Sequence, residues 1–156
     1  MRTICSEKKV IIPDEVELTI SKRVVQVKGP KGRLIRSFRH LTIFLERPSK
    51  GVVIVRKYFG MKKDLAAVKT IASHIENMIN GVLRGYEVRM KIAFAHFPIT
   101  LVLTGKDRCH VEIKNYLGSH ESMKFLLPRH VECKHDEETN NEIILSGTNI
   151  ELVTGA

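Results

Sequence analysis

Tryptophan is absent from these 156 residues, and cysteine occurs only three times. Three cysteines are too few, and odd in number, for a disulfide framework, which indicates free thiols in a reducing compartment. The first nine residues contain no apolar core of the kind that a secretory signal needs. The longest apolar stretch, residues 92–103, is too short to cross a bilayer. The sequence therefore predicts neither a secreted disulfide-rich protein nor a membrane protein.

Catalytic motifs are also missing. The chain has no Walker loop, no Gly-x-Gly-x-x-Gly, no nucleophile elbow and no His-Glu-x-x-His. The glycine-rich basic run 28–32 joins two expected strands, whereas a phosphate-binding loop joins a strand to a helix. We therefore expect no catalytic residue, no cofactor and no small-molecule substrate, and we do not expect an enzyme.

One group of residues could suggest a metal site. Cys109, His110, Cys133 and His135 are the only clustered cysteines and histidines. Adjacent residues on a strand face opposite sides, so Cys109 and His110 cannot both reach one ion there. No Cys-x-x-Cys pair is present, and the sequence predicts no metal.

The charge of the chain is strongly basic and unevenly distributed. Lysine and arginine number 26 against 17 acidic residues, a net charge of +9 with a pI near 9.6. Residues 1–81 hold 17 basic and 7 acidic side chains, whereas residues 82–156 hold 9 basic and 10 acidic ones. The excess of positive charge favours a polyanionic partner, most often nucleic acid, although a basic surface can also serve solubility alone.

A short segment occurs twice. Residues Val25–Gly32 read Val-Gln-Val-Lys-Gly-Pro-Lys-Gly, and Val111–Gly118, 86 positions later, read Val-Glu-Ile-Lys-Asn-Tyr-Leu-Gly. Both alternate apolar and polar residues up to a lysine, then place Gly29 or Asn115 where a positive φ angle is expected. The repeat predicts a strand–turn–strand unit used in two similar domains, with the alternative that any two β-hairpins look alike.

Alternating apolar residues predict short strands throughout both halves. Hairpin-length connections make the sheets largely antiparallel. The expected strands cover residues 10–12, 16–20, 24–28, 33–38, 41–45 and 52–56, and then 86–94, 99–104, 110–114, 123–126, 131–134, 142–145 and 150–153.

The spacing of the apolar residues changes after residue 60. Apolar residues recur at spacings of three and four from Leu65 to Val82, which predicts one long helix over about 62–80 that ends near Gly81. Such a helix covers a sheet, so we expect an α+β fold. The expected domains are residues 1–81, a hinge at 82–85, and residues 86–156. We expect the second repeat to be sheet only, with its helix missing from the chain as given.

Several basic side chains of the first domain are candidate contacts for a polyanion. Lysines at the start of a helix oppose its dipole unless an anion binds there, and the alternative is an ordinary solvated first turn. Basic residues on a sheet edge suit an RNA backbone but equally protect the edge from aggregation. The candidates are Lys28, Lys31, Arg33, Arg36, Lys62 and Lys63.

Four segments resemble one known family. They are Val27–Gly32, Thr70–Val82, Ala95–Ile99 and Val111–Gly118. In order and over nearly the whole chain they are similar to family six of the universal large-subunit ribosomal proteins, protein nine in the older eukaryotic naming, of the eukaryotic or archaeal type. The resemblance implies two α+β domains from an internal duplication. It also implies a structural role in the cytoplasmic ribosome, near the sarcin–ricin loop and the factor-binding region.

The resemblance also implies partners and a contact surface. The partners would be large-subunit rRNA and neighbouring ribosomal proteins, including proteins at the stalk base. The surface would combine the strand end Phe94–Pro98 with the turn Lys114–Gly118, where an exposed tyrosine could stack on a base or ribose. The expected rRNA-binding residues are Arg89, Lys91, His96, Lys114, Asn115, Tyr116 and Lys124. An alternative is a free-standing basic adaptor that binds an acidic protein.

Overall fold

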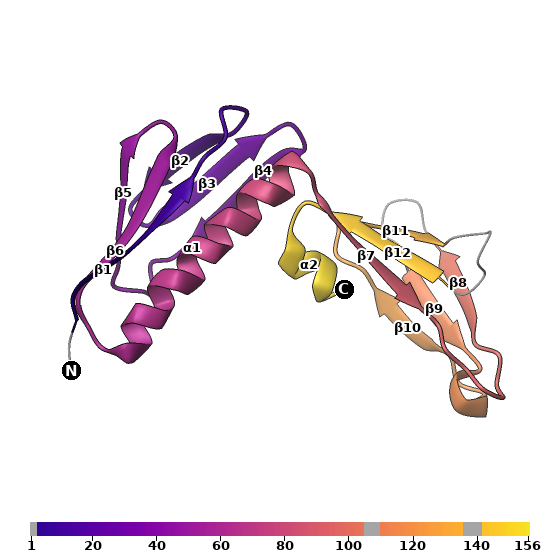
Figure 1. Ribbon diagram of the computed structural model, residues 1–156. Coiled ribbons are helices and arrows are strands. Elements are labelled where there is room, and N and C mark those ends of the chain that lie inside the picture. Colours follow the sequence, from indigo (N-terminus) through magenta and orange to yellow (C-terminus); the bar gives the residue numbers. More distant parts are fainter. Residues whose placement is uncertain (1–2, 105–109, 136–141) are drawn as a thin grey trace. The chain divides into compact units, whose positions relative to one another are not determined.

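Two compact units make up the chain, residues Met1–Gly85 and Tyr86–Ala156. The structure is a computed structural model, and it describes residues 3–104, 110–135 and 142–156. Within these ranges each unit contains two three-stranded antiparallel sheets and an α-helix (Figure 1). The mostly antiparallel α+β class expected from the sequence is confirmed.

The strands of the first unit form two sheets. One has the order β1-β6-β5 and the other β2-β3-β4, with all neighbours antiparallel. Their bounds are β1 Thr3–Ile11, β2 Glu17–Ser21, β3 Val24–Gly29, β4 Gly32–Ser37, β5 Phe44–Ser49 and β6 Val52–Gly60. The strand expected at residues 41–45 begins only at Phe44, because the chain before it makes turn hydrogen bonds from Leu41 to Phe38 and from Ile43 to Leu41.

Helix α1, Lys62–Leu83, covers these two sheets. It packs against β1, β3, β4 and β6, and its apolar stripe is buried from Val68 to Val82, with Ile71 and Ile75 fully buried. The stripe joins residues of both sheets in one core cluster of 17 buried side chains. The predicted helix is confirmed and runs three residues further than expected, since Gly81 is accommodated inside it and Gly85, at φ 79°, follows its end.

The second unit has the same types of element. One sheet has the order β11-β12-β7, and the other has the order β10-β9-β8. The strands are β7 Tyr86–Lys91, β8 Thr100–Thr104, β9 His110–Lys114, β10 Met123–Leu126, β11 Val131–His135 and β12 Glu142–Gly147. A 3-10 turn, η1 Tyr116–Gly118, precedes β10, and helix α2, Ile150–Thr154, follows β12.

The pairing of the strands shows the duplication. In each unit the first strand pairs with the sixth, which pairs with the fifth, while the second, third and fourth form a separate meander. The third strands, β3 and β9, begin at Val24 and His110, so the 86-residue offset of the sequence repeat is the offset between equivalent strands. A chance likeness of two hairpins would not reproduce six strands in one order, and the expectation of two similar domains is confirmed.

The end of the second unit corrects one expectation. Residues 150–153 are not a strand but the first part of α2, so this unit is not sheet only. The side chain of Asn149 accepts a hydrogen bond from the Glu151 amide at 3.1 Å, and Val153 is buried against the core of the unit. The sequence carries this signal, because asparagine followed by an acidic first-turn residue is a typical helix start.

The two repeats differ at the turn position where a positive φ angle is expected. Asn115 has a φ angle of 61°, and the glycines that end the two repeats, Gly118 and Gly32, have φ angles of 77° and 138°. Gly29 is different, since its φ is not positive and it lies within β3. A Cβ placed there would lie 2.5 Å from Cγ1 of Val82 on α1. Gly29 is therefore required by the close approach of the helix rather than by backbone conformation.

The core of the second unit is much smaller. Six buried side chains form its described cluster, against 17 in the first unit. Three large apolar side chains on the inner face remain exposed: Met90 at 42%, Met123 at 42% and Phe125 at 50%. Their cross-strand partners, Ile143, Ile113 and Val111, all belong to the core or pack against it. The inner face of this unit is thus only partly covered by α2.

Candidate nucleic-acid interface

Two segments come together at one end of the second unit. The amide of Asn115 donates a hydrogen bond to the carbonyl oxygen of Pro98 at 2.9 Å. A Cβ on Gly118 would lie 3.0 Å from the ring of Phe97, so the ring rests directly on the turn. Residues 94–98 are a loop rather than a strand end, because β7 already ends at Lys91. This loop and the turn 114–118 therefore form one surface, which we call the tip. Asn115 shapes this surface, because its side-chain donor is used inside the protein.

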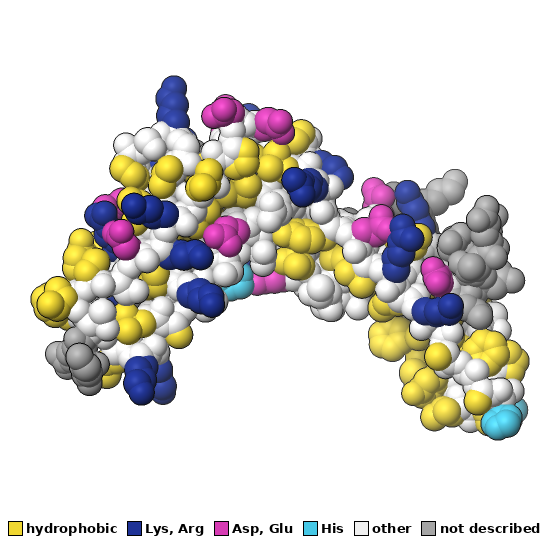
Figure 2. Space-filling model, in the orientation of Figure 1, with side chains coloured by type: hydrophobic (Ala, Val, Ile, Leu, Met, Phe, Trp, Pro, Cys, Tyr) yellow, Lys and Arg dark blue, Asp and Glu magenta, His cyan; other side chains and the backbone are white. Residues whose placement is uncertain are grey.

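The tip exposes several large apolar side chains. Phe94, Phe97, Tyr116 and Leu117 are between 43% and 75% exposed. Figure 2 shows hydrophobic side chains gathered where η1 lies in Figure 1. Aromatic rings held in the open next to cations are the platforms on which unpaired bases stack. Tyr116 and His96, both expected at this surface from the sequence, are exposed. The strand expected over residues 86–94 ends at Lys91, so Phe94 lies in the loop that follows; the flanking His-Phe-Pro is a signal for that loop.

A charged cluster lies on the outer face of the sheet β10-β9-β8. Glu112 is at its centre, with the ammonium of Lys114 at 3.7 Å and Lys124 opposite in the pairing. A hydrogen bond from Ser122 lowers the pKa of Glu112 below its ordinary value of 4.5, and the charges of Lys114 and Lys124 lower it further. The carboxylate thus pairs with Lys114, and the charge of Lys124 on the neighbouring strand gives the cluster a net positive charge.

Replacing Glu112 by glutamine tests this cluster. A carboxylate whose pKa is depressed in the folded state stabilises the protein above its unfolded pKa and loses that effect as the pH falls through the folded value. The wild type should therefore lose stability between neutral pH and pH values below 4.5 more steeply than Glu112→Gln. Urea midpoints measured across this range check the prediction, and parallel profiles for the two proteins would contradict it.

Arg89 and Lys91 do not belong to the same surface. They lie on the outer face of the sheet β11-β12-β7, where Arg89 pairs with Glu87 at 2.8 Å and Lys91 with Glu142 at 4.0 Å. The inner faces of both sheets contribute to one core, so their outer faces point away from each other. The structure brings His96, Lys114, Asn115, Tyr116 and Lys124 to one side and leaves Arg89 and Lys91 on another.

The basic candidates of the first unit are also divided. Lys28 and Arg33 are cross-strand neighbours on the outer face of the sheet β2-β3-β4, with Lys28 3.6 Å from Glu17. Arg36 is on the opposite face, because it is three residues from Arg33, and its guanidinium lies 3.5 Å from the ring of His74. These residues do not form one stripe.

Three lysines lie at the ends of helix α1. The ammonium of Lys31 donates to the carbonyl oxygen of Arg84, so it supplies the positive charge that the last turn of the helix lacks. At the other end, the Met61 amide donates to the Asp64 carboxylate at 3.0 Å beside Lys62 and Lys63. The Asp64 carboxylate therefore already accepts a hydrogen bond at the start of the helix. This favours an ordinary solvated first turn over a site for an external anion.

Among the residues that the structure describes, no group of three His, Cys, Asp or Glu side chains is arranged to hold a metal, and Cys5 is an exposed free thiol. Cys109, part of the cluster considered from the sequence, lies outside the described residues. No helix in the described ranges is long and apolar enough to span a membrane.

Comparison with known proteins identifies relatives among the ribosomal proteins. Residues 12–85 match the family model described as ribosomal protein L6. The large ribosomal subunit protein uL6 of Haemonchus contortus is 47% identical over 118 residues, covering 76% of this chain and 83% of that protein. The uL6 of Tetrahymena thermophila is 37% identical over 154 residues, covering 99% and 81%, and that of the archaeon Desulfurococcus amylolyticus is 40% identical, covering 94% and 77%. The chain belongs to the ribosomal protein L6 family.

Proposed function

We propose that this chain is a structural, non-catalytic constituent of the large ribosomal subunit and that it binds rRNA through the tip of its second unit. The relatives named above are large ribosomal subunit proteins. The observation that carries the proposal is the joining of two segments by the Asn115–Pro98 hydrogen bond, which exposes aromatic rings beside Lys114 and Lys124.

The mode of binding follows from these side chains. Lys114 and Lys124 contact phosphates. Their contribution to the binding affinity is independent of RNA sequence and sensitive to salt. Tyr116 and Phe97 stack on bases or riboses of an unpaired or irregular segment. An RNA helix lying flat on this side reaches Lys114 and Lys124 but not Arg89 and Lys91, which would need a second segment of rRNA.

The location within the subunit is the finer part of the proposal. We place the tip at the sarcin–ricin region and the factor-binding side, with proteins of the stalk base as neighbours. A compact stem-loop with an irregular end offers both phosphates and unstacked bases, which the lysines and the rings of the tip require together. The strongly basic first unit then faces a separate acidic partner.

Replacing Lys114 by alanine tests the interface. The variant should bind an RNA fragment that contains the sarcin–ricin stem-loop a few-fold more weakly, and the slope of log affinity against log salt should fall by about one unit. Filter binding between low and moderate salt measures both quantities. Lys69→Ala removes the same charge from an exposed position on α1 and should leave the slope unchanged. Equal slopes for wild type and Lys114→Ala would remove Lys114 from the interface.

Assembly into the ribosome is tested separately. The tagged chain should sediment with large subunits after a high-salt wash, because many contacts act together there. Salt-stable association with one protein in the absence of RNA would instead support a free-standing adaptor.

A further inference from the structure

The first unit has a groove between the free edges of its two sheets. Strand β2 is the last strand of one sheet and β5 is the last of the other. The groove encloses about 550 Å³ where β2 ends and β5 begins. This volume lies within the range of about 300–1,000 Å³ found for ligand sites in proteins.

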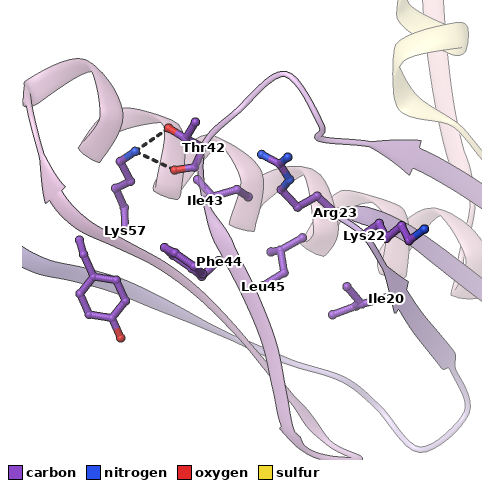
Figure 3. Close-up of a pocket in the computed structure, with 9 residues that line it drawn as sticks. Ile20, Lys22, Arg23, Thr42, Ile43, Phe44, Leu45 and Lys57 are labelled. Atoms are coloured by element: carbon purple, nitrogen blue, oxygen red, sulfur yellow. Dashed lines mark hydrogen bonds between the residues drawn. The ribbon is translucent and has the colours of Figure 1, made fainter.

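The centre of the groove is aliphatic. Ile20 from β2, Ile43 from the turn before β5 and Leu45 from β5 line it together. Ile43 is buried, whereas Ile20 and Leu45 are partly accessible, so the apolar surface is open to an incoming side chain. Figure 3 shows these side chains lying between basic residues at the two ends of the groove.

The basic residues are held in position by the backbone. Lys22 and Arg23 form the turn between β2 and β3, with φ angles of 47° and 62°, and Arg23 donates to the Leu41 carbonyl oxygen at 2.8 Å. At the other end, the ammonium of Lys57 donates to the carbonyl and hydroxyl oxygens of Thr42 at 2.7 and 2.6 Å (Figure 3). No aspartate or glutamate is among the described residues that line the groove. Three cations thus surround an apolar centre without an internal counter-ion.

We propose that this groove binds an acidic peptide segment that carries a large apolar side chain. The apolar side chain enters between Ile20, Ile43 and Leu45, and carboxylates on either side of it meet Lys22 with Arg23 at one end and Lys57 at the other. A carboxylate that meets these cations forms charge-assisted hydrogen bonds, which are stronger than neutral ones. The occupant is a segment of another protein, because complementary charge favours it and the first unit is basic overall.

The aliphatic centre of the groove favours a peptide over RNA. The rings of Phe44 and Tyr58 meet edge to face, with centroids 5.6 Å apart and an interplanar angle of 66°, and both remain exposed. A base that stacks on these rings leaves the surface of Ile20, Ile43 and Leu45 uncovered, whereas an apolar side chain covers it.

The test uses the full chain and a fluorescein-labelled decapeptide of alternating glutamate and leucine with one central phenylalanine. Anisotropy should show saturable binding at an ionic strength of about 0.15 M, where exposed charges are largely screened. Lys22→Glu and Phe44→Ser should each weaken binding, with Lys22→Glu giving a loss of at least about tenfold, since repulsion replaces attraction. The matched control, Lys63→Glu, makes the same charge change at an exposed residue of α1 and should change affinity less than about twofold.

Further measurements separate the possible outcomes. Amide shifts on titration should be confined to residues 20–23, 42–45 and 57–58, and a peptide with lysine in place of glutamate should not bind. Unchanged thermal midpoints would show that the variants remain folded. The proposal is overturned by an equal loss for Lys63→Glu, by the absence of saturable binding, or by a uridine decamer that displaces the peptide and shifts the same amides. None of these results depends on Lys114 or the tip, so the proposed rRNA interface stands or falls separately.

Discussion

Backbone amides of the second unit should exchange with solvent far faster than those of the first. In the full chain without RNA, the slowest amides of β9 and β12 should be at least about 100-fold less protected than those of β3 and β6. The reason is the size of the two cores, 17 buried side chains against six among the described residues. Each fully buried aliphatic side chain contributes roughly 1.5–3 kcal/mol, so the second unit has much less to oppose local opening.

Hydrogen exchange followed by NMR, corrected for intrinsic rates, measures this difference directly. All four strands lie in the centre of their sheets, so edge effects do not enter the comparison. Partial exposure of Met90, Met123 and Phe125 gives the same expectation, because an apolar face open to water favours a loosely packed unit or a bound partner. Equal protection in the two units would show that the core of the second unit is larger than its described residues indicate.

Replacing Gly29 by alanine should lower the free energy of unfolding of the first unit by about 2 kcal/mol, because the new methyl group overlaps a packed side chain. The ideal Cβ position is only 2.5 Å from Cγ1 of Val82, which is fully buried, so α1 must shift or the valine must leave its rotamer. Urea unfolding followed by circular dichroism measures the loss.

A second substitution shows whether this contact is the cause. Val82→Ala removes the overlapping atom and by itself should cost about 1–2 kcal/mol through lost burial. The double variant should then be more stable than the sum of the two losses predicts, by about 1 kcal/mol. Gly51→Ala is the matched control, since its Cβ would meet only the Ile12 carbonyl oxygen at 3.8 Å. Additive losses would mean that Gly29 is needed for some other reason.

Much of the architecture could be predicted from periodicity. The stripe from Leu65 to Val82 has the spacing of one helix face, and α1 follows it closely. Alternation gave most strands, and the 86-residue repeat gave equivalent strands in two units. The errors occurred where local pattern is weak. The first strand, Thr3–Ile11, is mostly polar because it is an edge strand, and Asn149 starts a short helix where apolar residues alone suggested a strand.

The candidate site was predicted less completely. Resemblance and charge pointed to the tip, and Asn115 was expected in a turn with positive φ. Only the structure shows that its side chain bonds to Pro98, and that Arg89 and Lys91 face a different side from Lys114. A count of lysines and arginines cannot separate these faces, since the direction of each side chain depends on strand register and on which face the core occupies.

The sequence by itself determined the family, the α+β class, the duplication and the basic character, because each depends on residue types and spacings along the chain. Tertiary structure alone decided which residues meet. It placed Gly29 against Val82, joined residues 94–98 to the turn at Asn115, and opened a cation-lined groove between β2 and β5. These contacts bring together residues between 17 and 53 positions apart. Their geometry is set by sheet pairing and helix packing, which no local pattern records.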